Sequence, residues 1–265
     1  MQNKLADAKC FLFDMDGTVY LGDHLLPGAK EIIAYLEHSG IRYYFLTNNS
    51  SRSRLDYVKK LADFGLHVPL EKIFSSGEAT AAYLQKQQPG ARVYLVGTPS
   101  LEGEFTEFGI NLVETEPDVV VLGFDTTLTY EKIWNLCSFV REGLPYIATH
   151  PDINCPTLDG VMPDIGSIMA LVLASTGREP DVIVGKPHQP MVEVILAKTG
   201  LSAAEIVMVG DRLYTDIALG QSGLTTVLVL SGETKRQALD GAKYQPDFIA
   251  RDLEDLLSQV LDQRA

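Results

Sequence analysis

The chain has 265 residues, of which 46% are hydrophobic and 22% are charged, so it can bury the core of one large domain or two modest ones. Its net charge of −13 argues against nonspecific binding to nucleic acid or to anionic membranes, although a local group of cations would still admit an anionic substrate. The polar first ten residues, the lack of an apolar run long enough to span a bilayer, and three scattered cysteines predict a cytoplasmic protein without disulfides.

Short apolar segments alternate with helical patterns along the chain. Most of these segments are continuous apolar runs rather than alternating ones, which is typical of parallel strands that are covered on both faces. We therefore predict an α/β fold whose strands are joined by right-handed crossovers. The expected strands are residues 10–13, 43–46, 93–96, 119–122, 146–148, 182–184, 206–209 and 226–230.

Helical patterns fill several of the intervals between these strands. The segment "PGAKEIIAYLEHSG" begins with proline and stops at glycine, which is the arrangement that helix ends favour. In "TYEKIWNLCSFVREG", Ile133, Leu136 and Val140 form one apolar stripe. Two further helices are expected in "PMVEVILAKTG" and in "DLEDLLSQVL".

The middle of the chain carries strands and helices of its own. We expect a second α/β unit there, inserted into the first, with hinges near Gly77 and Gly177. The predicted core then comprises residues 1–79 and 181–265, and the inserted unit comprises residues 80–180.

Polar residues follow four of the expected core strands at the points where these strands end. In open parallel sheets, ligands bind beyond the carboxyl ends of the strands, so these residues are candidates for one shared site. The candidates are four carboxylates, a lysine, a hydroxyl and an amide: Asp14, Asp16, Asp211, Asp216, Lys186, Thr47 and Asn48.

The charges of these candidates predict a metal ion. The four carboxylates carry a charge of −4 when all are ionised, and Lys186 offsets only one unit. Converging like charges raise one another's pKa values or push the strand ends apart. A divalent cation resolves this conflict, and carboxylate and carbonyl oxygens are ligands that suit Mg²⁺. We therefore predict Mg²⁺ as the cofactor of this protein. The ion would also bridge to an anionic substrate.

The neutral and cationic candidates fit a phosphoryl group. Thr47 and the backbone amides near Asn48 are donors and Lys186 is a point charge, and a phosphoryl group needs such partners on several sides. Asp14 would then be the nucleophile and form an aspartyl phosphate. Asp16, two residues on, points to the same side and could protonate the leaving oxygen and later deprotonate water.

The motifs "DMDGT", "TNN", Lys186 and "GDRLYTD", in this order, resemble the four motifs of the haloacid dehalogenase-like hydrolase superfamily. The long insert after the second motif resembles the type-two cap of the NagD-like, p-nitrophenylphosphatase-like branch, as do "TNNS", "ATHPDINCPT" and "GKPHQPM". The resemblance covers nearly the whole chain. It implies a Rossmann-like parallel-sheet core with a smaller inserted α/β cap, a Mg²⁺-dependent phosphatase of small phosphomonoesters, and a homodimer paired through the cap.

Carried over by position, the resemblance also implies roles for single residues. Asp14, the backbone carbonyl of Asp16 and Asp211 would hold the metal, and Asp216 would lie in or just outside the metal shell. The branch that the chain resembles is less uniform over the stretch 212–215, which leaves the roles of these residues open. An alternative for Asp216 is that it caps the helix that follows it, which is compatible with positioning the metal.

The resemblance assigns the phosphate to Thr47, Asn48 and Lys186. The expected partner is a small phosphorylated metabolite, namely a sugar phosphate, a nucleoside monophosphate, pyridoxal phosphate or p-nitrophenyl phosphate. His150 and Asp152 lie in the irregular stretch "THPDINCP", which by resemblance belongs to the cap. They are therefore candidates for contact with the leaving group and for substrate specificity.

Two other functions also use an aspartate that accepts a phosphoryl group. A signalling receiver places such an aspartate at a strand end near Mg²⁺, but receivers are much shorter, lack the insert and need no second acid such as Asp16. A phosphomutase uses the same chemistry and returns the phosphate to its substrate, and the sequence leaves this function open.

Overall fold

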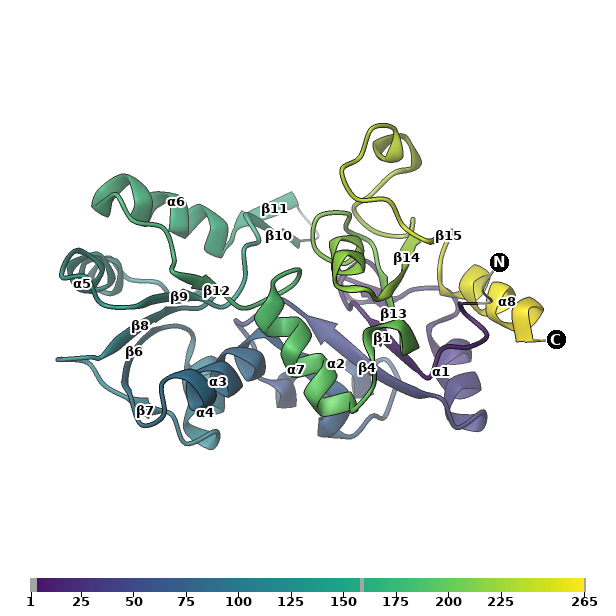
Figure 1. The fold of residues 1–265 in the computed structure, drawn as a ribbon, viewed down its shortest axis with the longest axis horizontal. Helices are drawn as coiled ribbons and strands as arrows, with labels where there is room; N and C mark the ends of the chain where they lie inside the picture. The colour runs from purple at the N-terminus through teal and green to yellow at the C-terminus, as the bar shows by residue number, and fades with distance from the viewer. Residues whose placement is uncertain (1–3, 158–159, 265) are drawn as a thin grey trace. The chain divides into compact units, whose positions relative to one another are not determined.

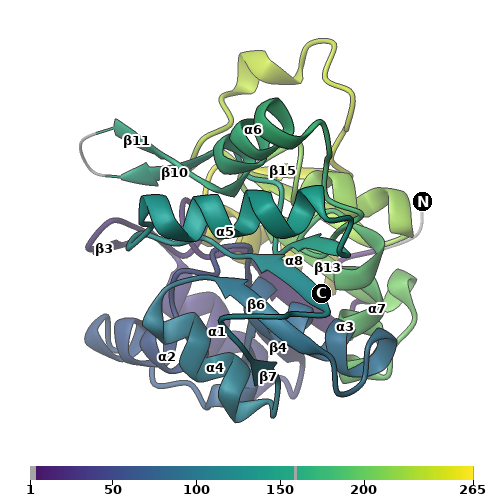
Figure 2. The ribbon, with the colours of Figure 1, turned by 90° about the vertical axis from the view of Figure 1, so that its left-hand side faces the viewer.

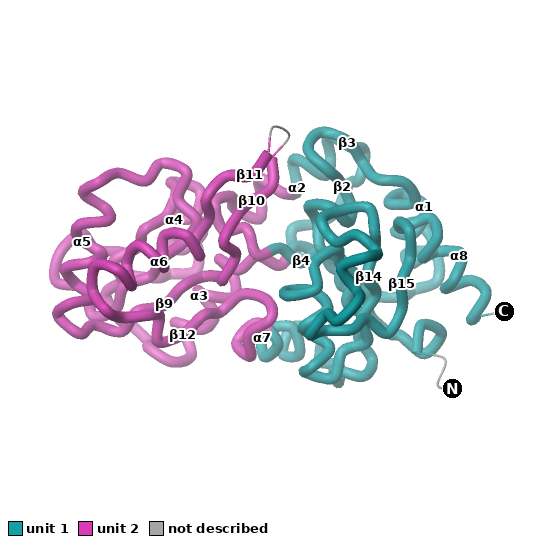
Figure 3. The backbone as a smooth tube through the Cα atoms, turned by 90° about the horizontal axis from the view of Figure 1, so that it is seen from above, with its two compact units in different colours: residues 1–47, 58–73, 192–265 teal, residues 48–57, 74–191 magenta. Residues whose placement is uncertain are grey.

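The computed structural model describes residues 4–157 and 160–264 of the chain (Figure 1). The chain divides into two compact units, which are coloured separately in Figure 3. The first unit comprises residues 1–47, 58–73 and 192–265, and the second comprises residues 48–57 and 74–191. Each unit is therefore built from segments that are distant in sequence. The expected limits of a cap at residues 80 and 180 stay a prediction.

The sheet of the first unit is built around β1 (Cys10–Phe13), whose four residues are all buried. This six-stranded sheet has the order β15-β14-β13-β1-β4-β5, and β1 pairs in parallel with β13 and β4. Phe13 is in register with Val209 on one side and with Phe45 on the other, so the carboxyl ends of three strands are aligned. The other strands are β4 (Arg42–Thr47), β5 (Ile73–Ser75), β13 (Ile206–Gly210), β14 (Thr225–Val229) and β15 (Phe248–Ala250).

Helices α1 (Ala29–His38) and α8 (Leu253–Arg264) of the first unit pack against each other. Their closest approach needs Gly28, because a Cβ atom there would lie 2.0 Å from the backbone nitrogen of Glu254. The unit also contains a small hairpin and short 3₁₀ turns, and two helices cross the boundary between the units. These elements are β2 (Tyr20–Leu21), β3 (His24–Leu25), η1 (Leu70–Lys72), η2 (Ala203–Glu205), η3 (Ile217–Ser222), η4 (Arg236–Leu239), α2 (Arg54–Asp63) and α7 (Gln189–Thr199).

The second unit is a three-layer α/β structure around a five-stranded parallel sheet with the order β12-β9-β8-β6-β7. Helices α5 and α6 cover one face, and α3 and α4 lie on the other (Figures 1 and 2). A two-stranded antiparallel hairpin of β10 and β11 precedes α6. The elements are α3 (Ser76–Gln87), β6 (Arg92–Val96), α4 (Pro99–Glu107), β7 (Asn111–Leu112), β8 (Val119–Leu122), α5 (Tyr130–Arg141), β9 (Tyr146–Ala148), β10 (Asn154–Thr157), β11 (Gly160–Pro163), α6 (Ile165–Thr176) and β12 (Val182–Ile183).

The predicted α/β class is confirmed, and every strand expected from the sequence is present with bounds within one residue. One strand lies in a different sheet from the one expected. The run at residues 182–184 was expected in the core sheet, whereas β12 pairs with β9 at the edge of the five-stranded sheet. Both residues of β12 are only partly buried, as is usual for an edge strand. A local apolar pattern predicts a strand, but it does not identify the partner of that strand.

Within residues 4–157 and 160–264, no helix combines the length and the apolar composition that crossing a bilayer requires.

Candidate active site

The acidic motif after β1 continues the pairing of that strand. The backbone nitrogen of Asp14 donates to the carbonyl oxygen of Val209 at 2.8 Å, so the pairing with β13 extends one residue beyond the end of β1. Met15 is buried, whereas Asp14 and Asp16 are each partly exposed. That the two carboxylates lie on one side of the backbone stays a prediction. The Tyr20 hydroxyl donates to Asp16 Oδ2 at 3.2 Å and thereby orients the second carboxylate.

Three carboxylates of the first unit converge. Asp14, Asp211 and Asp216 each contribute one oxygen, and these oxygens lie within 4.8 Å of one another. Asp211 follows β13, and Asp216 stands immediately before η3. The Asp216 side chain does not cap η3: its Oδ2 accepts from the backbone nitrogen of Arg212 at 3.1 Å. We call these three residues the acid group of the first unit.

Two glycines allow the chain to close around Asp211. A Cβ atom at Gly232 would lie 2.0 Å from Asp211 Oδ2, and one at Gly17 would lie 2.4 Å from the same oxygen. The backbone nitrogen of Glu233 donates to Asp211 Oδ2 at 2.6 Å. The Ser231 hydroxyl donates to the carbonyl oxygen of Gly17 at 2.8 Å. The segment 231–234 therefore holds the Asp211 carboxylate in one orientation.

The sequence interpretation did not identify the segment 231–234. The segment directly follows the expected strand 226–230 and contains a serine, a glycine and a threonine, so the rule that found the other strand-end residues also applies to it. The stretch 212–215, whose roles the resemblance left open, supports this segment. Arg212 Nε lies 3.1 Å from Glu233 Oε2, and the Tyr214 hydroxyl donates to the same oxygen at 3.2 Å.

The second oxygen of Asp211 favours a bound cation. Asp211 Oδ1 is buried and has no hydrogen-bond partner among the described residues. Burial, and after it the charge of Asp216, raises the pKa of Asp211 to about 7. A buried carboxylate oxygen without a partner is costly unless a cation or a donor compensates it. A donor set made of carboxylate oxygens fits a hard divalent cation such as Mg²⁺.

Thr47 lies beside the acidic motif in the sheet order. It is the last residue of β4, which pairs with β1, and it is buried. Thr47 and Asp14 therefore stand at the carboxyl ends of two neighbouring strands, as expected from the sequence.

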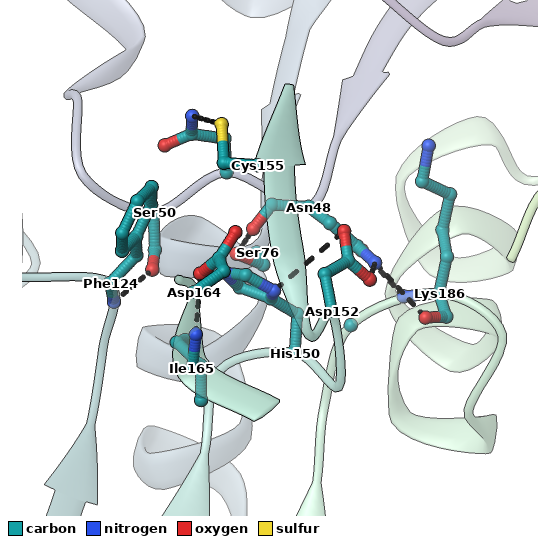
Figure 4. A network of polar contacts seen from close by, with 12 residues as sticks. Asn48, Ser50, Ser76, Phe124, His150, Asp152, Cys155, Asp164, Ile165 and Lys186 are labelled. Carbon is teal, nitrogen blue, oxygen red and sulfur yellow. Dashed lines mark hydrogen bonds and ion pairs between the residues drawn. The ribbon is translucent and has the colours of Figure 1, made fainter. Parts of the chain in front are cut away.

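Asn48 and Lys186 belong to the second unit and are joined to each other. Asn48 Oδ1 accepts from the backbone nitrogen of Lys186 at 2.8 Å, and Asn48 Nδ2 donates to the carbonyl oxygen of Lys186 at 3.1 Å (Figure 4). The bond between Lys186 and Pro187 is cis. The Lys186 side chain, which is 1% exposed, extends away from these contacts (Figure 4). Phosphate binding by Asn48 and Lys186 stays a prediction.

His150 and Asp152, the two expected specificity residues, are buried in the second unit. Asp152 Oδ1 accepts from Asn48 Nδ2 at 3.0 Å. His150 Nδ1 lies 3.9 Å from Asp152 Oδ2. These contacts are made within the protein, so they indicate a supporting role, and contact of either residue with a leaving group stays a prediction.

Comparisons with known proteins identify the family of the chain. A haloacid dehalogenase-like hydrolase model matches residues 11–111, and a HAD-hydrolase-like model matches residues 183–256. The acid sugar phosphatase of Staphylococcus aureus is 35% identical over 254 residues, which are 95% of this chain and 98% of the relative.

Solved structures with the same fold also carry phosphatase names. A 4-nitrophenylphosphatase from Thermotoga maritima superposes with a TM-score of 0.94 at 48% identity, covering 97% of this chain and 99% of that one. NagD from E. coli K-12 superposes with a TM-score of 0.86 at 31% identity, covering 93% and 97% of the two chains. The chain thus belongs to the haloacid dehalogenase-like hydrolase family, in the branch of NagD and the p-nitrophenylphosphatases, and is an enzyme of the phosphatase class.

Proposed function

We propose that this chain is a Mg²⁺-dependent phosphatase that hydrolyses small phosphomonoesters through an aspartyl phosphate on Asp14. The observation that carries the proposal is the convergence of Asp14 with Asp211 and Asp216 at the ends of the parallel strands. An acid group of this kind combines a nucleophile with ligands for a divalent cation.

Asp14, Asp211 and the backbone carbonyl of Asp16 would hold the metal ion, with Asp216 beside them. The buried Asp211 Oδ1, which lacks a partner among the residues that the structure describes, is the structural support for this assignment. When bound, Mg²⁺ neutralises carboxylate charge and draws negative charge from the phosphoryl oxygens.

The reaction follows from the two acids after β1. An oxygen of Asp14 attacks phosphorus, and the bond between phosphorus and the ester oxygen breaks. The Asp16 carboxyl gives its proton to that ester oxygen, which leaves as an alcohol. Asp16, now a carboxylate, takes a proton from the water that attacks the aspartyl phosphate. Inorganic phosphate then leaves, and the Asp14 carboxylate is regenerated. The hydrogen bond from Tyr20 to Asp16 supports this second role by orienting the carboxylate.

The phosphate would be bound by neutral donors and one cation. We assign the Thr47 hydroxyl and the backbone N–H of Asn48 as donors and the Lys186 ammonium as the counter-charge. The side-chain amide of Asn48 already bonds to Lys186 and Asp152, which leaves the backbone N–H for the substrate. Such donors stabilise charge that develops on the phosphoryl oxygens in the transition state.

The names of the relatives favour two of the four candidate substrate classes. Acid sugar phosphatase and 4-nitrophenylphosphatase point to sugar phosphates and to p-nitrophenyl phosphate. The other two candidate classes are nucleoside monophosphates and pyridoxal phosphate, and a panel of substrates to test should contain all four classes.

Phosphate release from this panel, with Mg²⁺ and with a chelator, tests the proposal. We expect release that requires Mg²⁺ and that is lost in Asp14→Asn, with one ester hydrolysed faster than the rest. Release that continues at the same rate in the chelator would refute the metal dependence. Release that survives in Asp14→Asn would refute the nucleophile.

A further inference from the structure

We infer that Asp152, His150 and Asp164 form a buried support that fixes the backbone of Lys186 through Asn48. They would act as positioning residues for phosphate binding, without touching the substrate. The inference rests on the proposed function, since that function gives Lys186 its role.

The first link is the two-point contact between Asn48 and the Lys186 backbone. The backbone N–H of Lys186 can only donate, so the Asn48 atom that faces it at 2.8 Å must be Oδ1. Asn48 Nδ2 then donates to the carbonyl oxygen of Lys186 at 3.1 Å. The backbone at Lys186 is thereby held on both its donor and its acceptor side.

Asp152 sets the orientation of the Asn48 amide. Its Oδ1 accepts the second hydrogen of Asn48 Nδ2 at 3.0 Å. An ionised carboxylate can only accept hydrogen bonds, so a flipped Asn48 amide would place two acceptors against each other. The charge and position of Asp152 therefore select the amide orientation that binds Lys186. The Ser76 hydroxyl, which donates to the Asn48 carbonyl oxygen, fixes the backbone of the same residue (Figure 4).

His150 compensates the charge of Asp152. Its ring is fully buried, and its two nitrogens face two carboxylates: Nδ1 lies 3.9 Å from Asp152 Oδ2, and Nε2 lies 3.6 Å from Asp164 Oδ1. Two buried carboxylates need a compensating charge or several donors. A protonated imidazole would place a positive charge between the two carboxylates.

The support ends on the first turn of α6. Asp164 caps this helix, since its Oδ1 accepts from the backbone nitrogen of Ile165 at 2.6 Å. The backbone nitrogen of Gly166 donates to the carbonyl oxygen of Asp152 at 2.8 Å. A helix of 12 residues thus anchors the far end of the support.

The three side chains also have ligand atoms within 4.8 Å of one another, a spacing that suits a metal ion. The nearest approaches of the two carboxylates are to opposite nitrogens of one ring. We infer from this placement an imidazole between two acids, and a bound metal ion is the alternative outcome of the test.

The support packs closely against the loop that carries Lys186. A Cβ atom at Gly185 would lie 2.6 Å from the Cβ of His150 and 2.7 Å from Asn48 Oδ1. The loop that carries Lys186 therefore lies directly against both residues. A shift of His150 or Asn48 has to displace this loop.

The test separates phosphate binding from metal binding in Asp152→Asn, which keeps the size of the side chain and removes its charge. We expect the inhibition constant of inorganic phosphate, measured against p-nitrophenyl phosphate, to rise about tenfold, as for loss of one buried polar partner. The affinity for Mg²⁺, measured by calorimetry, should stay within about twofold. Asp164→Asn, one link further away, should give a smaller change in the same direction.

Asp125→Asn is the matched control, because Asp125 is a buried acid of the same unit whose partners are Lys132 and Thr127. It should leave the phosphate inhibition constant within about twofold of the parent value. A phosphate constant unchanged in Asp152→Asn, or raised equally in Asp125→Asn, would overturn the inference. If Asp152→Asn does not fold, the same criteria apply to Asp164→Asn.

Two further measurements address the charge on His150. The ring nitrogen shifts of His150 should show a doubly protonated imidazole at neutral pH, and a neutral ring would contradict the support as described. Metal analysis of the purified protein should find no transition metal that is lost in His150→Ala. Parent protein that releases no phosphate from any ester would instead refute the proposed function.

Discussion

Two groups of acids lie in the two units, and they differ in how their charge is compensated. The acid group of the first unit consists of Asp14, Asp211 and Asp216, and one oxygen of Asp211 has no partner within the described parts of the chain. In the second unit, the imidazole of His150 lies between Asp152 and Asp164, and the Asn48 amide donates to Asp152. The first group is suited to take up a cation from solution, whereas the second has an imidazole 3.6–3.9 Å from its two acids and an amide donor to one of them. The number of acids in a group therefore does not identify a metal site, but their partners do.

The largest expected effect comes from removing the nucleophile of the first group. Asp14→Asn keeps the shape of the side chain but replaces the carboxylate with a poor nucleophile, so hydrolysis should fall by about 10⁴-fold or more. Steady-state assays with p-nitrophenyl phosphate measure this loss, and circular dichroism checks that the fold is kept. Turnover near the parent rate would remove Asp14 from its role.

The next effect separates the two halves of the reaction. Asp16→Asn removes the acid and base but leaves Asp14 in place, so a substrate with a good leaving group should still phosphorylate Asp14. Hydrolysis of the aspartyl phosphate should slow by roughly 10²–10⁴-fold, which is the usual contribution of general base catalysis. Rapid-quench measurements with p-nitrophenyl phosphate follow both steps. Equal slowing of the two steps would point to a structural role for Asp16.

A glycine substitution sharpens the claim that the first group is shaped for a cation. In Gly232→Ala, the added Cβ atom would lie 2.0 Å from Asp211 Oδ2, so the carboxylate must move. We expect the affinity for Mg²⁺ to fall by about 10–100-fold, as when other residues that orient metal ligands are changed. Gly103→Ala is the control, because a Cβ atom there meets no atom within 4 Å. Calorimetric titration of both variants decides the matter, and equal affinities would contradict this account of the segment 231–234.

The last prediction concerns a dependence of stability on pH. The pKa of Asp211 in the folded, metal-free protein is raised from 3.8 to about 7, so the folded state binds this proton more tightly than the unfolded chain. Its contribution to stability is therefore fully present below about pH 4 and is lost as the pH rises through 7. In Asp211→Asn this loss is absent.

Urea unfolding in a chelator measures this difference. Between about pH 4 and pH 8, the free energy of unfolding of the parent protein should fall relative to Asp211→Asn by roughly 2–4 kcal/mol. Added Mg²⁺ should stabilise the parent protein at the higher pH and leave Asp211→Asn unchanged. If both proteins show the same pH dependence, ionisation of Asp211 does not destabilise the folded protein.

The sequence predicted the parts of the fold that depend on local pattern. Continuous apolar runs identified β1, β8 and β9 with the bounds that the structure has. Three residues are too few to show a period, so strands of this length are found in some cases, as with β9, and missed in others, as with β5 and β15.

The candidate site was predictable to the extent that it follows strand ends. Asp14 and Asp211 follow β1 and β13, which are paired in parallel, and the structure places these two acids together with Asp216. Lys186 was placed by the same rule, although its strand β12 belongs to the other sheet. The pairing of distant strands and the contacts of Asn48, Asp152 and His150 arise from tertiary packing, which no local pattern contains.

The central claim is that Asp14 accepts the phosphoryl group. The most direct measurement is acid quenching of the enzyme during turnover of p-nitrophenyl phosphate with Mg²⁺, followed by mass spectrometry of its peptides. We predict a phosphoryl adduct on Asp14 that accumulates in Asp16→Asn and is absent in the chelator. An adduct on another residue, or continued turnover without any adduct in either protein, would contradict the account.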